Sequence, residues 1–406
     1  MNVKLFLGSF LLAFIHFSSF FSQSDSTIKS DTIFNLNPVF TTVADLLDNE
    51  TQSQDVSGLL QSSRDVFAAQ AGFNFSAARF RFRGYSSEHT NLLIEGLPVN
   101  DPESGWAIWS YWGGLNDMTR YPQVRNGISA SPVAFGGLSG YSSISLRPST
   151  KRSGPRISYA STNRAYRNRM MYSYNSGLTT KGWAFSACVS TRYSDEGYID
   201  GTYYSSLSYL LGIEKKINSF HSVSLVGFAA PTVQARQGIA LQEVYDLTGN
   251  NYYNPYWGYQ TQSNGTLKKR NARLRDNHKP YTLLSHYWTP NEKIKLSTTL
   301  YAVVGKTGNT NLNWYDAQDP RPDYYRYLPS FYSDDPQLMS TVQQSWQDND
   351  PSTTQLDWDG MYNANYKNLY SVINPNGDQG TVLTANRSKY IVVEYRLDPR
   401  QVGFNS

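Results

Sequence analysis

The sequence predicts a mainly β protein, in which a small α+β domain precedes a long series of antiparallel strands. Two observations support this fold class. Only 17% of the 406 residues are charged, against roughly 25% in a typical globular domain, while 15% are aromatic and 31 are Tyr. From about residue 155 onward, apolar and polar residues alternate with a period of two, which is the period of a strand.

The first 22 residues have the layout of a secretory signal peptide. Lys4 precedes an apolar run from Leu5 to Ile15, and small and polar residues follow around Ser22. This run is too short to cross the roughly 30 Å of hydrocarbon in a bilayer as a helix. We therefore expect export, with residues 23–42 forming a polar leader before the folded part of the chain.

The residues that carry chemistry argue against catalysis. The five His lack metal-ligand spacing, and no nucleophile-elbow or metalloprotease motif is present. An acidic group, Asp348, Asp350, Asp357 and Asp359, lacks the spacing of a calcium loop and is interpreted as surface acidity. The single Cys188 excludes an intramolecular disulfide framework, and a net charge of +4 without a long basic run gives nucleic-acid binding little support. We expect no enzymatic activity, no cofactor and no metal.

Residues 43–150 are predicted to form the α+β domain. Apolar residues between Val43 and Ala69 are spaced as in two short helices. Leu92 to Ile94 form a strand that a turn at Glu95 and Gly96 closes. Residues 121–146 add a second strand pair around a glycine-containing loop.

Residues 151–406 are predicted to contain about eight strands of alternating polarity. Along Trp183 to Ser190, for example, one face is apolar and the other largely polar. The apolar face would meet a second sheet in a soluble sandwich and lipid in an outer-membrane barrel, and alternation does not separate these alternatives. The strands are expected to start near Arg156, Met170, Trp183, Ser205, Ser222, Tyr281, Ile294 and Tyr390.

The lengths of the connections favour the barrel. Leu178–Lys181, Ile217–His221 and Pro290–Lys293 are tight turns, whereas Pro231–Pro280 and Thr307–Lys389 are long and rich in aromatic residues. Bacterial outer-membrane barrels have short periplasmic turns and long extracellular loops. Compact soluble domains rarely carry loops of such length. We therefore predict antiparallel transmembrane strands in the outer membrane.

Three stretches of the α+β domain resemble the plug of TonB-dependent receptors. They are an arginine-containing strand that ends in glycine (80–84), an apolar strand with an acidic-Gly turn and a return strand (91–101), and a pair of strands with a Gly-rich link (124–146). The matching residues are Arg81, Arg83, Gly84, Glu95, Gly96, Gly127, Gly136 and Gly137. The resemblance is close over about residues 43–148 and rests on strand pattern alone beyond them.

The resemblance implies a plugged barrel that binds an extracellular nutrient (a siderophore, cobalamin, a glycan or a peptide) and imports it into the periplasm. The implied partners are a TonB-type energy-transducing protein in the periplasm, outer-membrane lipid, the nutrient and a surface lipoprotein. Asp31, Thr32, Ile33 and Phe34 lie where the family carries its TonB box, a segment that adds as a strand to the periplasmic partner. They depart from the usual valine-rich box, so an inert linker is the alternative.

Side chains with two alternative roles lie in the plug and in the long loops. Arg81 and Arg83 share one strand face and are expected either to pair with inward Glu214 and Glu394 or to remain solvated. Aromatic residues of the long loops are expected to bind the nutrient, with packing against one another or an interfacial aromatic girdle as the alternatives. The loop residues are Tyr252, Tyr253, Tyr256, Trp257, Trp314, Tyr315, Tyr324 and Tyr325.

The number of strands limits this interpretation. A barrel that encloses a plug has about 22 strands, and about eight leave a lumen that side chains fill. We therefore expect the chain to be the N-terminal portion of a longer receptor. The alternative function is a secreted or outer-membrane β-rich binding or adhesion protein without transport.

Overall fold

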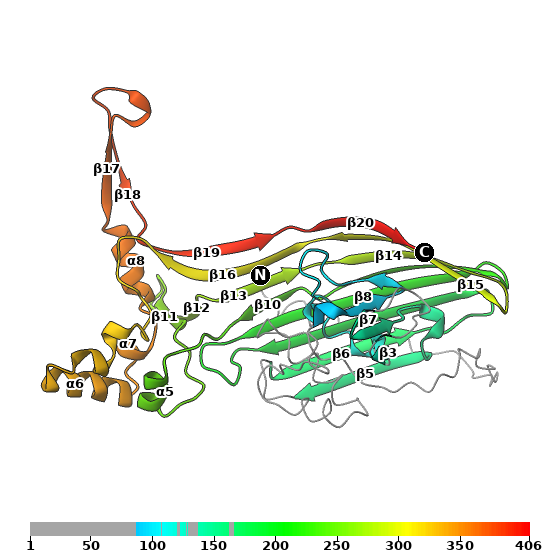
Figure 1. Ribbon diagram of the computed structural model, residues 1–406, viewed down its shortest axis with the longest axis horizontal. Coiled ribbons are helices and arrows are strands. Elements are labelled where there is room, and N and C mark those ends of the chain that lie inside the picture. Colours follow the sequence, from blue (N-terminus) through cyan, green and yellow to red (C-terminus); the bar gives the residue numbers. More distant parts are fainter. Residues whose placement is uncertain (1–86, 107, 120–121, 127, 129–136, 162–165) are drawn as a thin grey trace. The chain divides into compact units, whose positions relative to one another are not determined.

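The computed structural model describes residues 87–106, 108–119, 122–126, 128, 137–161 and 166–406. The structure is mainly β, as predicted. A four-stranded sheet and a 12-stranded sheet contain most of its strands (Figure 1). Residues 87–150 are the described part of the domain that was predicted to resemble a plug, and for reference we call them the plug domain and the larger sheet the wall sheet. The helices predicted between Val43 and Ala69 lie outside the described residues.

The plug domain is built on the four-stranded sheet, with strand order β2-β1-β4-β3. Its strands are β1 (Thr90–Ile94), β2 (Leu97–Pro98), β3 (Gln123–Asn126) and β4 (Gly140–Ile144). β1 and β4 are parallel, and the other neighbours are antiparallel. Four short helices accompany them, namely η1 (Ser87–His89), η2 (Trp109–Tyr111), α4 (Asn116–Thr119) and η3 (Pro148–Thr150).

Backbone geometry explains three of the predicted plug positions. Glu95 and Gly96 connect β1 to β2 with φ of 51° and 76°, and two consecutive positive φ angles define the tight turn that suits a two-residue hairpin. Gly137 lies so close to the chain that an added Cβ would be 2.3 Å from the carbonyl oxygen of His89. Glycine at position 137 is therefore required for the close approach of two backbone segments.

The 12 strands of the wall sheet form eight antiparallel passes, because four passes are interrupted once and divide into two strands each. The strands are β5 (Gly154–Ser161), β6 (Asn168–Asn175), β7 (Trp183–Ser194), β8 (Tyr204–Lys216), β9 (His221–Ala229), β10 (Thr232–Ala235), β13 (Leu274–His278), β14 (Tyr281–Asn291), β15 (Ile294–Val304), β16 (Lys306–Trp314), β19 (Tyr390–Leu397) and β20 (Arg400–Asn405). All eight predicted starts lie within two residues of an observed strand start, and Tyr281 begins β14, the second strand of a pass whose first strand begins at Leu274. Within the described residues, β5 and the pass of β19 and β20 form the two edges of the sheet.

The predicted difference between short and long connections is present. Residues 176–182, 217–220 and 292–293 join strands at one end of the sheet, and 236–273 and 315–389 join them at the other. Both long loops are shorter than expected, because β10, β13 and β16 continue the sheet into the sequence that was predicted to be loop. These strands lack a clear apolar period, so the pattern that revealed the other strands is missing there.

The long connections contain elements that the sequence pattern did not reveal. Residues 236–273 hold α5 (Gln242–Thr248) and the hairpin of β11 (Trp257–Thr261) and β12 (Leu267–Asn271). Residues 315–389 hold η4 (Tyr325–Tyr327), η5 (Pro329–Tyr332), α6 (Pro336–Gln347), α7 (Pro351–Thr354), α8 (Trp358–Tyr366), η6 (Pro375–Gly377) and the hairpin of β17 (Leu369–Ile373) and β18 (Val382–Asn386). Two of the predicted surface acids, Asp350 and Asp357, cap the N-termini of α7 and α8.

The polarity of the wall sheet is the reverse of that of a soluble sheet. Along β7 and β8, the row of side chains that includes Phe185 and Leu211 is apolar and exposed by 42% and 67%. The opposite row, which includes Ser186 and Ser208, is buried. In a soluble sandwich the apolar row would be covered by a second sheet, and the described residues place no sheet there. We call the apolar exposed side the outer face and the buried side the inner face.

The inner face packs against the plug domain. One hydrophobic cluster joins Trp112 and Met118 of the plug domain to inward residues of the wall sheet, namely Met171, Cys188, Leu210, Val226, Phe228 and Leu283. The ring of Trp112 lies edge-on to that of Tyr281 at 5.9 Å. None of the helices in the described part of the chain has the length and apolar character needed to span a bilayer.

Candidate functional site

The candidate site is the contact between the plug domain and the inner face of the wall sheet. Its centre is the carboxylate of Glu95, a buried acid in the turn between β1 and β2. This carboxylate accepts hydrogen bonds from the Ser145 hydroxyl at 2.9 Å, from the Leu146 backbone N–H and from the Tyr287 hydroxyl of β14. Glu95 therefore ties its turn both to the end of the plug sheet and to the wall.

A buried ion pair lies beside Glu95. The Nε of Arg147, just beyond the plug sheet, donates to Oε1 of Glu214 on β8 at 2.7 Å, and the Ser149 backbone N–H donates to Oε2 at 3.0 Å. The Glu214 side chain is fully buried, so its charge depends on these donors. The Arg147 guanidinium also lies 4.3 Å from the centre of the Tyr287 ring.

This pairing differs in part from the expectation for Glu214. The proposed partners, Arg81 and Arg83, lie outside the described residues, and the cation observed on Glu214 is Arg147. Arg147 precedes a proline in an irregular segment, so no strand pattern drew attention to it. Glu394, the second expected acid, is exposed on β19, where its carboxylate lies against Gly308.

Lys151 extends the polar contact toward β5. Its ammonium donates to the carbonyl oxygens of Met118 and Ser145, both at 2.6 Å. Burial lowers the pKa of Lys151 to about 8, against the opposing influence of the Glu95 charge. The segment that leaves the plug domain is thus held by a partly desolvated cation.

Short polar side chains of the wall bind the plug backbone. The Ser208 hydroxyl donates to the carbonyl of Gly113 at 2.6 Å, the Thr299 hydroxyl to that of Glu95 at 3.1 Å, and the Asn405 amide to that of Gly96 at 2.7 Å. Neutral hydrogen bonds of this kind contribute about 0.5–1.5 kcal/mol each. The wall therefore holds the plug partly through many individually weak contacts.

Three buried cations lie on the inner face nearer the long loops, namely Arg192, Arg275 and Lys279. Arg192 donates to the Ser206 hydroxyl at 3.1 Å and lies 5.3 Å from the Tyr204 ring, while the Lys279 ammonium lies 4.9 Å from the Tyr111 ring. Sequence reasoning missed them. The available signal was a cation at an inward position of an otherwise small and polar row.

The structure separates the aromatic residues of the long loops into two groups. Tyr253 is buried against Trp346, and Tyr256, Trp257 and Trp314 also pack against other loop or strand residues. Tyr252, Tyr315 and Tyr325 are about half exposed, and Tyr324 lies edge-on to Tyr325 at 4.8 Å. Tyr252, Tyr315 and Tyr325 therefore present the most ring surface among the predicted loop residues.

The remaining predicted positions lie outside the described residues. They are Gly84, Gly127, Gly136 and the candidate TonB box Asp31, Thr32, Ile33 and Phe34. No group of three or more His, Cys, Asp or Glu with the arrangement of a metal site occurs in the described part of the chain.

Solved structures with a similar arrangement are receptors and transporters. The chain is similar to the siderophore receptor PiuA from Acinetobacter baumannii, with 15% identity and a TM-score of 0.41, covering 59% of this chain and 32% of that one. It is also similar to the ferric-catecholate import receptor Fiu from E. coli K12, with 11% identity and a TM-score of 0.40, covering 57% of this chain and 32% of that one. A third similar structure is that of the ferric citrate transporter FecA, with 10% identity and a TM-score of 0.37, covering 58% of this chain and 33% of that one.

The chain thus spans about a third of the length of these receptors. The likeness to these structures concerns the fold alone. No protein-family model matches the sequence, and no curated protein matches it.

Proposed function

We propose that this chain forms the plug and the first part of the barrel of a TonB-dependent outer-membrane receptor, which binds an extracellular nutrient and admits it to the periplasm. The observation that carries the proposal is the reversed polarity of the wall sheet. An apolar outer face suits lipid, and an inner face that mixes many small polar residues with an apolar patch and binds a separate domain suits a plugged lumen. A soluble β protein would bury the opposite rows.

The chemistry of the contact supports a plug that can be displaced. Hydrogen bonds from Ser208, Thr299 and Asn405 can exchange with water at little net cost once the lumen is hydrated. The Arg147–Glu214 pair is the exception, because separating a buried pair leaves a charge uncompensated until water reaches it. We therefore propose this pair as the contact that resists displacement most strongly.

The force for displacement is proposed to enter through residues 31–34. An extended segment that pairs with a periplasmic protein through main-chain hydrogen bonds transmits tension along its own backbone. Replacing Ile33 by Pro removes one backbone donor, so uptake should fall while the receptor remains in the membrane. Unchanged uptake by this variant would assign residues 31–34 to an inert linker.

The nutrient is proposed to be a siderophore, cobalamin, a glycan or a peptide. PiuA, Fiu and FecA are a siderophore receptor, a ferric-catecholate import receptor and a ferric citrate transporter, and an iron chelate is one member of that class. Competitive growth of a deletion strain on defined iron, cobalamin, glycan and peptide sources distinguishes the members.

The location and the fold of the protein can be tested together. We expect the full gene product in the outer-membrane fraction, with faster migration on a detergent gel before boiling than after it, because a closed barrel resists detergent. Recovery as soluble protein with a single migration would favour the alternative, a secreted β-rich binding protein. An adhesin would remain in the membrane but give no growth defect on any nutrient.

A further inference from the structure

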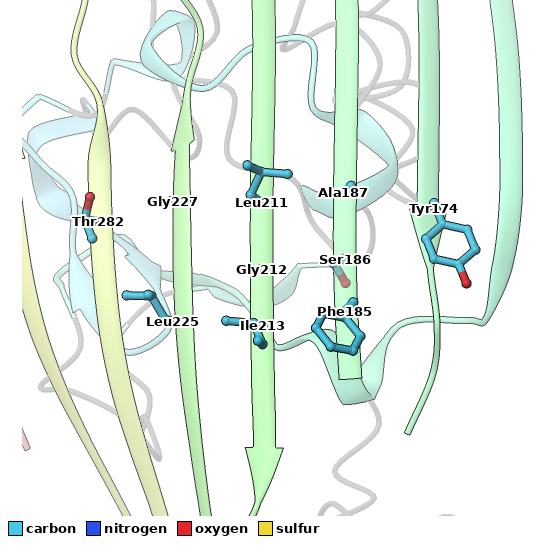
Figure 2. Close-up of a pocket in the computed structure, with 10 residues that line it drawn as sticks. All are labelled: Tyr174, Phe185, Ser186, Ala187, Leu211, Gly212, Ile213, Leu225, Gly227 and Thr282. Carbon is cyan, nitrogen blue, oxygen red and sulfur yellow. The ribbon is translucent and has the colours of Figure 1, made fainter. Parts of the chain in front are cut away.

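The outer face of the wall sheet contains one shallow apolar hollow of about 440 Å³. Gly227 of β9 lies between Leu211 on β8 and Thr282 on β14, and Phe185, Ile213 and Leu225 line the neighbouring row (Figure 2). The atom nearest to an added Cβ at Gly227 would be the Tyr281 carbonyl oxygen, 3.9 Å away. The missing side chain therefore leaves real space on a face that is otherwise covered with apolar side chains.

A basic rim lies at the short-turn end of the same sheet. We define it as Lys181, Lys215, Lys216, Lys293 and Lys295. The acids at this end are Glu292, in a turn, and Glu214, which faces inward and is neutralised by Arg147. The rim thus carries a net positive charge where the outer face would meet the headgroups of the periplasmic leaflet.

Outward side chains of the rim are held in fixed positions. The Lys215 ammonium donates to the Lys181 carbonyl oxygen at 2.8 Å and lies 4.8 Å from the centre of the Trp183 ring. The ring nitrogens Nδ1 of His221 and Nε2 of His286 are 3.0 Å apart, which leaves a second nitrogen on each ring outside that bond. Lys215 and His286 both pair with Val223 in register, so they belong to one row across the strands.

The distance between this row and the hollow matches the distance between the phosphate and the upper acyl chain of a phospholipid. Val223 and Gly227 are four residues apart on β9, which corresponds to about 13 Å along an extended strand. The headgroup region of one leaflet is about 5–8 Å thick, from the difference between the total and hydrocarbon thickness of a bilayer. A phosphate at the row of Lys215 therefore places the hollow several ångströms inside the hydrocarbon.

We propose that the outer face binds one phospholipid, with its phosphate at Lys215 and His286 and an acyl chain in the hollow at Gly227. The proposal rests on the proposed membrane location of the wall sheet. Charge complementarity with the basic rim favours a lipid over a second copy of this chain, because a second copy would bring an equally basic rim to the contact.

Retention of phosphatidylglycerol by the purified full-length receptor in detergent tests the proposal. Protein incubated with the lipid is freed of excess by gel filtration, and bound lipid is counted by native mass spectrometry. Wild-type protein should retain one molecule per chain. Gly227→Leu, which fills the hollow, and Lys215→Gln, which removes the charge, should each weaken retention about tenfold.

Matched variants separate the proposed site from general lipid binding. Thr191→Leu places the same leucine side chain on the outer face of β7 away from the hollow, and Lys268→Gln removes a charge from β12 in a long loop. Both should retain lipid as the wild type does. Inorganic phosphate added together with the lipid should not reduce the amount of lipid retained, because the acyl chain supplies part of the affinity.

Three results would overturn the proposal: equal retention by Gly227→Leu and wild type, equal loss in Thr191→Leu, or a dimeric mass that Gly227→Leu abolishes. Membrane fractionation and heat-modifiable migration are scored on the same preparations. A lipid site that fails while both properties persist leaves the proposed function intact, and loss of both properties in the wild type would refute that function itself.

Discussion

The carboxylate of Glu95 lies where three segments meet: its own turn, the end of the plug sheet and the wall strand β14. Its three donors, from Ser145, Leu146 and Tyr287, come from two of these segments. A carboxylate that accepts several hydrogen bonds contributes more than a neutral acceptor in the same place. At the scale of single residues, the plug is therefore held by a few charged groups among many weak neutral ones.

Replacing Glu95 by Gln should loosen the plug domain. The amide keeps the size of the side chain but is a weaker acceptor and brings two donors toward groups that already donate, so we expect a loss of about 1–3 kcal/mol. The free energy of opening is measured by limited proteolysis of the plug segment in the purified receptor. Glu103→Gln, at an exposed position, is the control and should match the wild type.

The Arg147–Glu214 pair should respond asymmetrically to substitution. Glu214 is fully buried and Arg147 keeps 28% of its side chain exposed. Arg147→Met leaves a buried carboxylate with one backbone donor and should cost about 3–5 kcal/mol, whereas Glu214→Gln leaves a cation that water can reach and should cost less. Urea denaturation of both single variants and of the double variant gives the coupling, and equal losses in the two single variants would contradict this assignment.

Asp323, in the long loop after β16, should make the stability of that loop depend on pH. Burial raises the pKa of Asp323 to about 6, despite the opposing influence of Arg321. Because the folded loop holds the proton more tightly than the unfolded chain, stability is highest below about pH 4, falls as pH rises to about 6, and is then constant.

The measurement compares wild type with Asp323→Asn. The difference in their unfolding free energies should grow by up to about 3 kcal/mol in favour of the variant between pH 4 and pH 7. Fluorescence of Trp346, buried in the same loop, reports local unfolding. A difference that does not change with pH would show that Asp323 does not bury its charge.

At the scale of elements, the hairpin of β17 and β18 stands apart from the rest of the long loop (Figure 1). All ten of its strand residues are exposed, although Leu369, Ile373 and Val382 are apolar. Isolated two-stranded hairpins are marginally stable in water. A hydrogen bond from the Arg387 backbone N–H to the Asn368 carbonyl at 2.8 Å closes the hairpin base.

Removing residues 369–386 should therefore leave the remainder of the receptor folded. With Asn368 joined to Arg387 through a short Gly-Ser linker, we expect unchanged heat-modifiable migration and unchanged amount in the outer membrane, because no core residue is lost. A fall in either property would mean that the hairpin stabilises neighbouring loops. The same variant then shows whether nutrient uptake uses the hairpin.

Elements differed in how far their sequence predicted them. Passes with an apolar outer row, such as β7 and β8, were predicted nearly to the residue, because alternation of apolar and polar residues with a period of two is a strong signal. Helices α6 and α7 were missed, although Asp335-Pro336 and Asp350-Pro351 each supply a capping acid and a proline at the first turn. These residues mark the start of a helix, but no apolar periodicity follows them, so the region was predicted to be a loop.

At the scale of the whole molecule, the contact site was the least predictable part. Glu214 and the Glu95–Gly96 turn were singled out from the sequence, but Arg147, Lys151 and Tyr287 were not. These partners are separated by many residues and meet only because the plug domain lies against the inner face. Pairing between distant segments depends on packing, which a one-dimensional pattern does not contain.

If the wall sheet lies in the outer membrane as proposed, the continuation of its strands beyond the apolar belt has a consequence for the surface of the cell. The pass of β15 and β16 covers residues 294–314, about 65 Å of extended chain, and a tilt near 45° still gives it a height of about 45 Å against an apolar band of about 25 Å. At that location the sheet would hold the two long loops clear of the lipid. Bulky agents such as antibodies or phage tail fibres would then meet residues 236–273 and 315–389 before they met the bilayer.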